Sequence, residues 1–331
     1  MIVITGGAGM IGSMIAWHLN TQLKYHDLVI ADHITHEAQW QNLVHRKYIT
    51  YLDKDQLFDW LYDNDNEDIT AIIHMGAISA TTERDFNKLV EANIQYSQYL
   101  WHWCADHQVP FFYASSAATY GDGSKGYNDV SIDGLRPLNG YGYSKHFFDQ
   151  WVLRQVAEKR PCPPSWAGFK FFNVYGPNEY HKERMASVAF HTFNQFREHG
   201  TMKLFKGTKE GIEDGMQMRD FVYVKDAAAI VCHFYTTAQN GKPTANGIYN
   251  IGTGIARSFK DLATTVMTSM GREPDITYID MPEDLQGKYQ YFTEANMRKL
   301  RAAGYNENFY SIEDGVKDYV QNYLMQEDRY C

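Results

Sequence analysis

The chain has 331 residues with 31 Lys and Arg against 40 Asp and Glu, so its formal net charge is −9. An acidic chain without a basic run lacks the cations that neutralise phosphates, which argues against DNA or RNA as partners. The longest uninterrupted apolar run, residues 227–232, is far shorter than the ~20 residues of a membrane helix. The first residues, MIVITGGAG, do not resemble a signal peptide. We therefore expect no membrane partner.

The four cysteines, at 104, 162, 232 and 331, have neither CxxC spacing nor a short metal-ligand pattern. In a chain of this length such usage is typical of a reduced, cytoplasmic protein. We expect no bound metal.

The first half of the chain alternates short apolar runs with helical patterns. Strands are predicted at residues 1–5, 28–31, 69–74, 109–115 and 167–172, and helices at residues 10–23, 84–106 and 141–158. Such alternation is typical of βαβ units and a parallel sheet buried on both faces.

After residue 173 the pattern is broken by polar loops, and apolar runs at 221–224 and 248–251 are predicted to rejoin the sheet. The predicted fold is α/β: a Rossmann-type doubly wound parallel sheet with a smaller, discontinuous α/β substrate-binding domain. We expect residues 1–173 and 221–254 to form the cofactor domain, and residues 174–220 and 255–331 the substrate domain.

A glycine motif, GxxGxxG at Gly6, Gly9 and Gly12, follows the first predicted strand and opens the first predicted helix. Such glycines allow a tight turn and bring the helix N-terminus close to a pyrophosphate. An acid, Asp32, follows about 20 residues later, as a dinucleotide-binding fingerprint requires. This context indicates a nicotinamide dinucleotide site, and the spacing suggests the short-chain dehydrogenase superfamily.

A YxxxK pair, Tyr141 and Lys145, lies in a predicted helix, where residues four apart share a face. A phenol has a pKa of ~10 and is a poor base until a neighbouring cation favours its phenolate. Ser116 lies at the end of the fourth predicted strand, where ligands of open α/β sheets bind. Its hydroxyl is predicted to hydrogen-bond the substrate oxygen that Tyr141 deprotonates. A surface Tyr with an unrelated Lys is the alternative.

Five stretches, TGGAGxIG, HxGAxS, SSAATYG, YGYSK and FFNVYGP, together resemble an extended short-chain dehydrogenase/reductase acting on a nucleotide sugar. More local stretches, above all FNVYGPxExHK and MASVAFH, resemble the ADP-L-glycero-D-manno-heptose 6-epimerases. The resemblance implies oxidation at C6″ of the heptose by a tightly held NADP, a 6-keto intermediate, and reduction from the opposite face. The resemblance also implies that the reaction supplies heptose for the lipopolysaccharide inner core.

The resemblance also assigns roles to residues. The two bases are Tyr141 and Lys182, with Ser116 and Lys145 completing the catalytic set. From the residues alone, a solvated loop lysine is the preferred interpretation of Lys182, and only the resemblance makes it a base. Cofactor contacts are implied for Gly6, Gly9, Met10, Ile11, Gly12, Asp32, His33, Gln39, Lys54, Met75, Gly76, Ala77, Ile78, Ser79, Asn93, Lys145, Val174 and Lys182. Substrate contacts are implied for Ser116, Asn173, Arg184, His191, Phe205, Lys206, Gly207, Thr208, Arg219 and Tyr289.

The chain departs from the family pattern at the ribose end of the cofactor site. His33 and Gln39 stand where the family has Asn and Lys, and an acid such as Asp32 usually selects NAD by binding the 2′-hydroxyl. Lys54 is predicted to compensate, so NADP is expected and NAD remains the alternative. The segment 209–217 is longer than in the family.

Three other functions are alternatives to the 6-epimerase expectation. A 4,6-dehydratase would need an Asp-Glu pair where this chain has Ala117 and Ala118. A 4-epimerase shares most of the motifs. A non-catalytic dinucleotide-binding regulator would be expected to lose Tyr141 or Lys145. By resemblance the enzyme is a homo-oligomer, specifically a homopentamer.

Overall fold

A computed structural model describes residues 1–63, 68–208, 211–241, 245–282 and 290–331. Its central feature is a seven-stranded, all-parallel sheet in the order β10-β6-β5-β4-β1-β2-β3. The strands are β1 (Ile2–Thr5), β2 (Leu28–Asp32), β3 (Thr50–Asp53), β4 (Ala71–His74), β5 (Phe111–Ser116), β6 (Trp166–Phe171) and β10 (Gly247–Ile251). This arrangement confirms the predicted doubly wound α/β fold.

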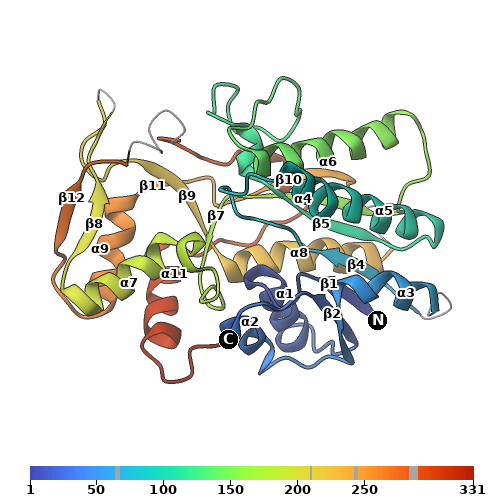
Figure 1. Ribbon diagram of the computed structural model, residues 1–331, viewed down its shortest axis with the longest axis horizontal. Coiled ribbons are helices and arrows are strands. Elements are labelled where there is room, and N and C mark those ends of the chain that lie inside the picture. The colour runs from blue at the N-terminus through green and yellow to red at the C-terminus, as the bar shows by residue number, and fades with distance from the viewer. Residues whose placement is uncertain (64–67, 209–210, 242–244, 283–289) are drawn as a thin grey trace.

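Helices cover both faces of this sheet because its strands are apolar on both sides (Figure 1). In β1, Ile2 and Ile4 face one buried cluster and Val3 faces the other. The first cluster includes α1 (Met10–Thr21) and α8 (Val224–Gln239), and the second includes α3 (Leu57–Asp63), α5 (Tyr96–Asp106) and α6 (Gly140–Ala157).

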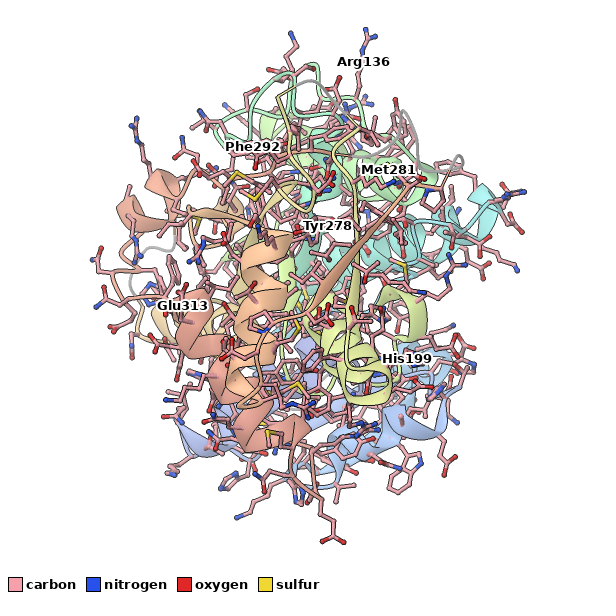
Figure 2. All side chains as sticks on the ribbon, turned by 90° about the vertical axis from the view of Figure 1, so that its left-hand side faces the viewer. Arg136, His199, Tyr278, Met281, Phe292 and Glu313 are labelled. Carbon is pink, nitrogen blue, oxygen red and sulfur yellow. The ribbon has the colours of Figure 1, made fainter. Side chains whose placement is uncertain are left out.

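Two smaller sheets lie at the other end of the molecule. One has the order β11-β9-β7, from β7 (Asn173–Tyr175), β9 (Met218–Tyr223) and β11 (Ala256–Ser258), and the other pairs β8 (Met202–Phe205) with β12 (Ile276–Ile279). Helices α7 (Val188–His199), α9 (Phe259–Ser269) and α11 (Ile312–Tyr319) accompany them. Figure 2 views the molecule from this end, where His199 of α7, Tyr278 of β12 and Glu313 of α11 are labelled.

Two predicted elements differ from the observed ones, and strand β3 was not predicted. The run at 221–224 lies in β9 and the start of α8, and β9 pairs with β7 and β11 instead of rejoining the main sheet. The predicted helix 84–106 is divided into α4 (Phe86–Leu89), a π-helical turn (Val90–Gln95) and α5. Strand β3, whose residues are only half-buried, was missed because it lacks an apolar run.

Two further short α-helices are α2 (Glu37–Trp40) and α10 (Arg298–Ala302). The four cysteines are free thiols. Among the described residues, no helix has the length and apolar character needed to cross a membrane, and no group of acidic, His and Cys side chains is arranged to hold a metal ion.

Candidate active site

A cavity of about 930 Å³ lies at the carboxyl ends of the parallel strands and extends to β8 and β9. The loop after β1, the loop after β4, the end of β5 and the first turns of α6 line one part of it. The carboxyl ends of strands are where open α/β sheets bind ligands. The cavity therefore joins the predicted cofactor site to the predicted substrate site.

The glycine loop makes a tight turn in which the backbone leaves no room for side chains. Gly6 has φ +63°, and a Cβ there would lie 2.5 Å from the backbone nitrogen of Gly76. A Cβ on Gly12 would lie 2.1 Å from the carbonyl oxygen of Gly6. Gly9 precedes α1 without a side-chain cap, so the N–H groups of the first turn are available to an anion.

Asp32, at the end of β2, lies at the ribose end predicted for the cofactor and holds the glycine loop. Its carboxylate accepts hydrogen bonds of 2.8 Å from the backbone N–H groups of Ala8 and His33. Burial raises the pKa of Asp32, and these hydrogen bonds together with one from Gln39 oppose the rise.

Tyr141, Lys145 and Ser116 meet at the carboxyl end of β5. Burial raises the pKa of Tyr141, and a hydrogen bond between its side chain and the Ser116 hydroxyl opposes part of this rise. The Lys145 ammonium donates a 2.9 Å hydrogen bond to the carbonyl of Ala114. Burial lowers the pKa of Lys145 to about 8, so this group titrates within reach of neutral pH.

Lys182 enters the cavity from a different element, the loop between β7 and α7. Its ammonium lies 3.9 Å from the sulfur of Met10, at the start of α1. Burial lowers the pKa of Lys182, and the nearby Glu179 opposes the shift. A lysine with a lowered pKa can serve as a base, which a solvated loop lysine cannot do at neutral pH.

Arg219, on β9, lines the same cavity and is 7% exposed. Its guanidinium lies over the ring of Phe259 and donates to the carbonyl of Met218. The carboxylate of the neighbouring Asp220 accepts hydrogen bonds from the backbone N–H groups of Thr253, Gly254 and Ala295. A planar guanidinium in this position is suited to a diphosphate.

Most of the predicted site residues line this one cavity. They are Gly6, Gly9, Met10, Ile11, Gly12, Asp32, Gln39, Met75, Gly76, Ala77, Ser79, Ser116, Tyr141, Lys145, Asn173, Val174, Lys182, His191, Phe205 and Arg219.

Other predicted residues are absent from the described lining of the cavity: His33, Lys54, Ile78, Asn93, Arg184, Lys206, Gly207 and Thr208. At the cofactor end, His33 pairs with Asp53, and Lys54 pairs with Asp55. Asn93 is buried in the π-helical turn and hydrogen-bonded to the backbone of Ile78, so it connects this turn to the loop after β4.

At the substrate end, Lys206 pairs with Asp280, and Thr208 is hydrogen-bonded to Tyr291. The backbone N–H of Gly207 donates to Asp214, and Arg184 is exposed. Tyr289 and residues 209–210 of the long segment lie outside the described residues.

The structure adds polar residues that the sequence analysis missed. His181, Gln195, Gln217, Gln290 and Thr293 also line the cavity. His181 had a signal in the sequence, since it precedes Lys182 in the HK pair, and Gln290 directly follows the predicted Tyr289. Gln217 ends the long segment 209–217, whereas Gln195 and Thr293 belong to no motif.

The fold and the cavity define a class of protein. Residues 2–252 match the profile of the NAD dependent epimerase/dehydratase family. Dependence on NAD or NADP follows from this membership and agrees with the glycine loop and Asp32.

Similar proteins of known name identify one family within the epimerase/dehydratase class. An ADP-L-glycero-D-manno-heptose-6-epimerase of Fusobacterium nucleatum is 51% identical, with all of both chains covered. One from Nitratidesulfovibrio vulgaris is 47% identical over 99% of each chain. The chain belongs to the ADP-L-glycero-D-manno-heptose-6-epimerase family.

Solved structures agree with this assignment. The Helicobacter pylori ADP-L-glycero-D-manno-heptose-6-epimerase has a TM-score of 0.80 and 27% identity, covering 97% of this chain and 95% of its own. A UDP-glucose 4-epimerase of Brucella ovis in complex with NAD has a TM-score of 0.79 and 19% identity, covering 97% of each chain. The second likeness shows the shared fold alone.

Proposed function

We propose that the protein is an isomerase that interconverts ADP-D-glycero-D-manno-heptose and ADP-L-glycero-D-manno-heptose by inverting C6″, in the supply of heptose for the lipopolysaccharide inner core. The observation that carries this proposal is that two candidate bases, Tyr141 from α6 and Lys182 from the loop after β7, line one cavity. Inversion at a carbinol carbon needs a base for each position of the hydroxyl, because the two epimers present it differently.

The glycine loop, the first turn of α1 and Asp32 are the groups that would hold the cofactor. When bound, a nicotinamide dinucleotide supplies a reversible hydride acceptor at the reacting carbon.

Side chains of the protein transfer the hydroxyl protons of the reaction. Tyr141 removes the hydroxyl proton of one epimer, with Ser116 hydrogen-bonded to the same oxygen and the cation of Lys145 favouring the phenolate. With the C6″ hydride accepted by the bound nicotinamide, the sugar would become a 6-keto intermediate, and the same hydride would return to the opposite face of that carbon. After the intermediate turns in the cavity, Lys182 provides the proton at the other hydroxyl position. Arg219 binds the diphosphate and retains the intermediate during the turn.

We propose NADP in preference to NAD, on the family resemblance and on two basic side chains near Asp32, those of His33 and Lys54. Asp32 and Asp53 are opposite each other at the ends of the parallel strands β2 and β3. His33 and Lys54 come directly after these two strand ends. Each is already paired with a carboxylate, so a 2′-phosphate would have to displace Asp53 and Asp55. Calorimetric titration with both nucleotides tests this choice, and tighter binding of NAD would overturn it.

We further propose that residues 1–173 with 221–254 bind the cofactor and that residues 174–220 with 255–331 close over the sugar. We also propose a homo-oligomer, a homopentamer by resemblance, acting in the cytoplasm. Sedimentation equilibrium of the purified protein tests the assembly.

The central experiment is incubation of the purified protein with ADP-D-glycero-D-manno-heptose, followed by NMR at C6″. Appearance of the L-glycero epimer supports the proposed reaction, and the cofactor released on denaturation identifies the nucleotide. Bound cofactor without epimerisation would overturn the reaction while leaving the dinucleotide site intact.

A further inference from the structure

A buried ion pair lies directly behind the catalytic candidates. Asp149 follows Lys145 by four residues and Tyr141 by eight, so all three lie along one face of α6. Its carboxylate is 2.6 Å from the ammonium of Lys170 on β6, and both side chains are completely buried.

The pair connects α6 to the strand that carries Ser116. Asp149 accepts hydrogen bonds from the hydroxyl groups of Tyr113 (3.1 Å) and Ser115 (2.7 Å) on β5. Between these two residues lies Ala114, whose carbonyl accepts from Lys145. Consecutive turns of α6 are therefore fixed to consecutive residues of β5.

Lys170 extends this network into the turn after β5. Its ammonium also donates a 2.7 Å hydrogen bond to the hydroxyl of Thr119, and Thr119 in turn donates to the carbonyl of Ser116. Both charges thus act on the residues immediately around Ser116.

Stability alone is a weak reason for such a pair. The cost of removing two charges from water often equals or exceeds their attraction, and well-packed apolar residues serve the fold equally well. The position of this pair, one helical turn from Lys145, suggests a second role. Asp149 raises the pKa of Lys145 and so partly offsets the larger lowering by burial.

We propose that Asp149 and Lys170 are positioning residues for the reaction: they fix Tyr141 and Lys145 against β5 and determine the electrostatic field at the Lys145 ammonium. The inference rests on the proposed function for its catalytic meaning, but the field at Lys145 exists without substrate. The titratable groups around this site include His74 on β4, Tyr113 on β5, Lys170 on β6, and Tyr141, His146 and Asp149 on α6. On the side of the ion pair, Tyr120 interacts with Asp149 and Lys170, and Asp129 and Lys299 interact with Lys170.

The first test measures the pKa of Lys145 without turnover. The full-length protein is trace-acetylated with acetic anhydride over a range of about pH 6 to 11, and labelling of Lys145 is read by peptide mass spectrometry. Lys170→Met removes the ion-pair partner of Asp149, so the carboxylate acts on Lys145 alone and should raise the pKa of Lys145 by about half a unit or more. Asp149→Asn removes the carboxylate charge and should lower this pKa by about the same amount. Shifts below about 0.2 unit in both variants would overturn the proposal.

Two further variants separate positioning from general stability. Asp149→Asn/Lys170→Met leaves no lone buried charge and should give an intermediate pKa of Lys145, so it keeps the test available where a single variant does not fold. Lys225→Met breaks a partly buried ion pair of 2.7 Å with Asp318, away from the described cavity lining. It should destabilise the protein without moving the pKa of Lys145; an equal shift in this control would refute the assigned role.

The second test uses ADP-D-glycero-D-manno-heptose. In Asp149→Asn we expect kcat to fall about tenfold or more with KM changed less than about twofold, because the reacting groups are displaced while the diphosphate contacts remain. An unchanged kcat would contradict positioning. If the wild-type protein does not convert the sugar, the proposed function fails, and the labelling titration still decides the role of the pair.

Discussion

The ammonium of Lys182 lies against the sulfur of Met10, at 3.9 Å, so the loop after β7 touches the first turn of α1. Met10 is 4% exposed and begins the helix whose N-terminus faces the predicted pyrophosphate. A candidate base is thereby placed beside the cofactor site, in a location where burial lowers its pKa.

Lys182→Met keeps the aliphatic stem and removes the amine. We expect epimerisation to fall about 10²- to 10⁴-fold, the usual contribution of a positioned base, while cofactor remains bound. NMR at C6″ and mass spectrometry of the released nucleotide measure the two properties. Lys88→Met, an exposed lysine on α4, serves as the matched control and should keep wild-type turnover. Near-wild-type turnover of Lys182→Met would remove this lysine from the mechanism.

The Lys182 loop is itself held by a buried carboxylate. Glu179 accepts a hydrogen bond from the hydroxyl of Ser187 (2.7 Å) and another from the hydroxyl of Tyr319 (3.0 Å), and it raises the pKa of Lys182. Glu179→Gln should therefore lower that pKa further and loosen the loop. We expect about a tenfold loss of kcat/KM. An unchanged kcat/KM, with unfolding by urea also unchanged, would contradict the anchoring role.

Activity should fall at alkaline pH because Lys145 loses its charge. Burial lowers the pKa of this ammonium to about 8, so it is cationic below that pH and neutral above it. The neutral form no longer favours the Tyr141 phenolate. We expect kcat/KM to decrease as pH rises through about 8, and Lys145→Met to be nearly inactive without this decrease. A wild-type profile that stays flat between neutrality and the titration range of free lysine would contradict this assignment.

In the candidate site, the glycine turn and the shared helix face of Tyr141 and Lys145 could be predicted because their signals are local. The turn at Gly6 and Gly12, and the shared face of Tyr141 and Lys145, depend on neighbours within a few residues along the chain. Alternating apolar runs likewise predicted most strands of the main sheet.

The remaining features depend on contacts between distant segments. The apolar run in β9 is indistinguishable in sequence from a strand of the main sheet, and its pairing with the distant strands β7 and β11 places it elsewhere. Asp149 and Lys170 are 21 residues apart in sequence, and neither belongs to a motif that predicts the ion pair. Similarly, Glu179 meets Tyr319 from a position 140 residues away.

Gly12→Ala should abolish cofactor binding because its Cβ would lie 2.1 Å from the carbonyl oxygen of Gly6, a backbone atom of the same loop. The loop must move, and the first turn of α1 moves with it. Calorimetric titration should show at least about a hundredfold weaker binding of NADP and NAD. Gly271→Ala is the control: its φ is +72° with open space around the Cβ, so it should cost about 1 kcal/mol of stability and leave affinity unchanged. Equal affinity in Gly12→Ala and wild type would refute the proposed cradle.

Acidification should destabilise the protein through His74. This histidine is buried between Thr5 and Ser97, with hydrogen bonds of 2.5 Å and 2.8 Å. Burial first, and Lys145 second, lower its pKa from 6.5 to about 3. Between these two pH values the unfolded chain binds a proton that the folded chain does not, so the free energy of unfolding falls as pH decreases, by about 1.4 kcal/mol per pH unit.

His74→Gln removes this titration. Urea unfolding at about pH 7 and pH 5 should show that wild type loses about 2 kcal/mol more than the variant over this interval, as the linkage slope requires. The absolute stability of the variant at neutral pH is lower, since one of the two hydrogen bonds is lost, so the comparison rests on the difference between the two pH values. His107→Gln, at an exposed position, should retain the wild-type loss. An identical loss in His74→Gln and wild type would assign the acid sensitivity to other groups.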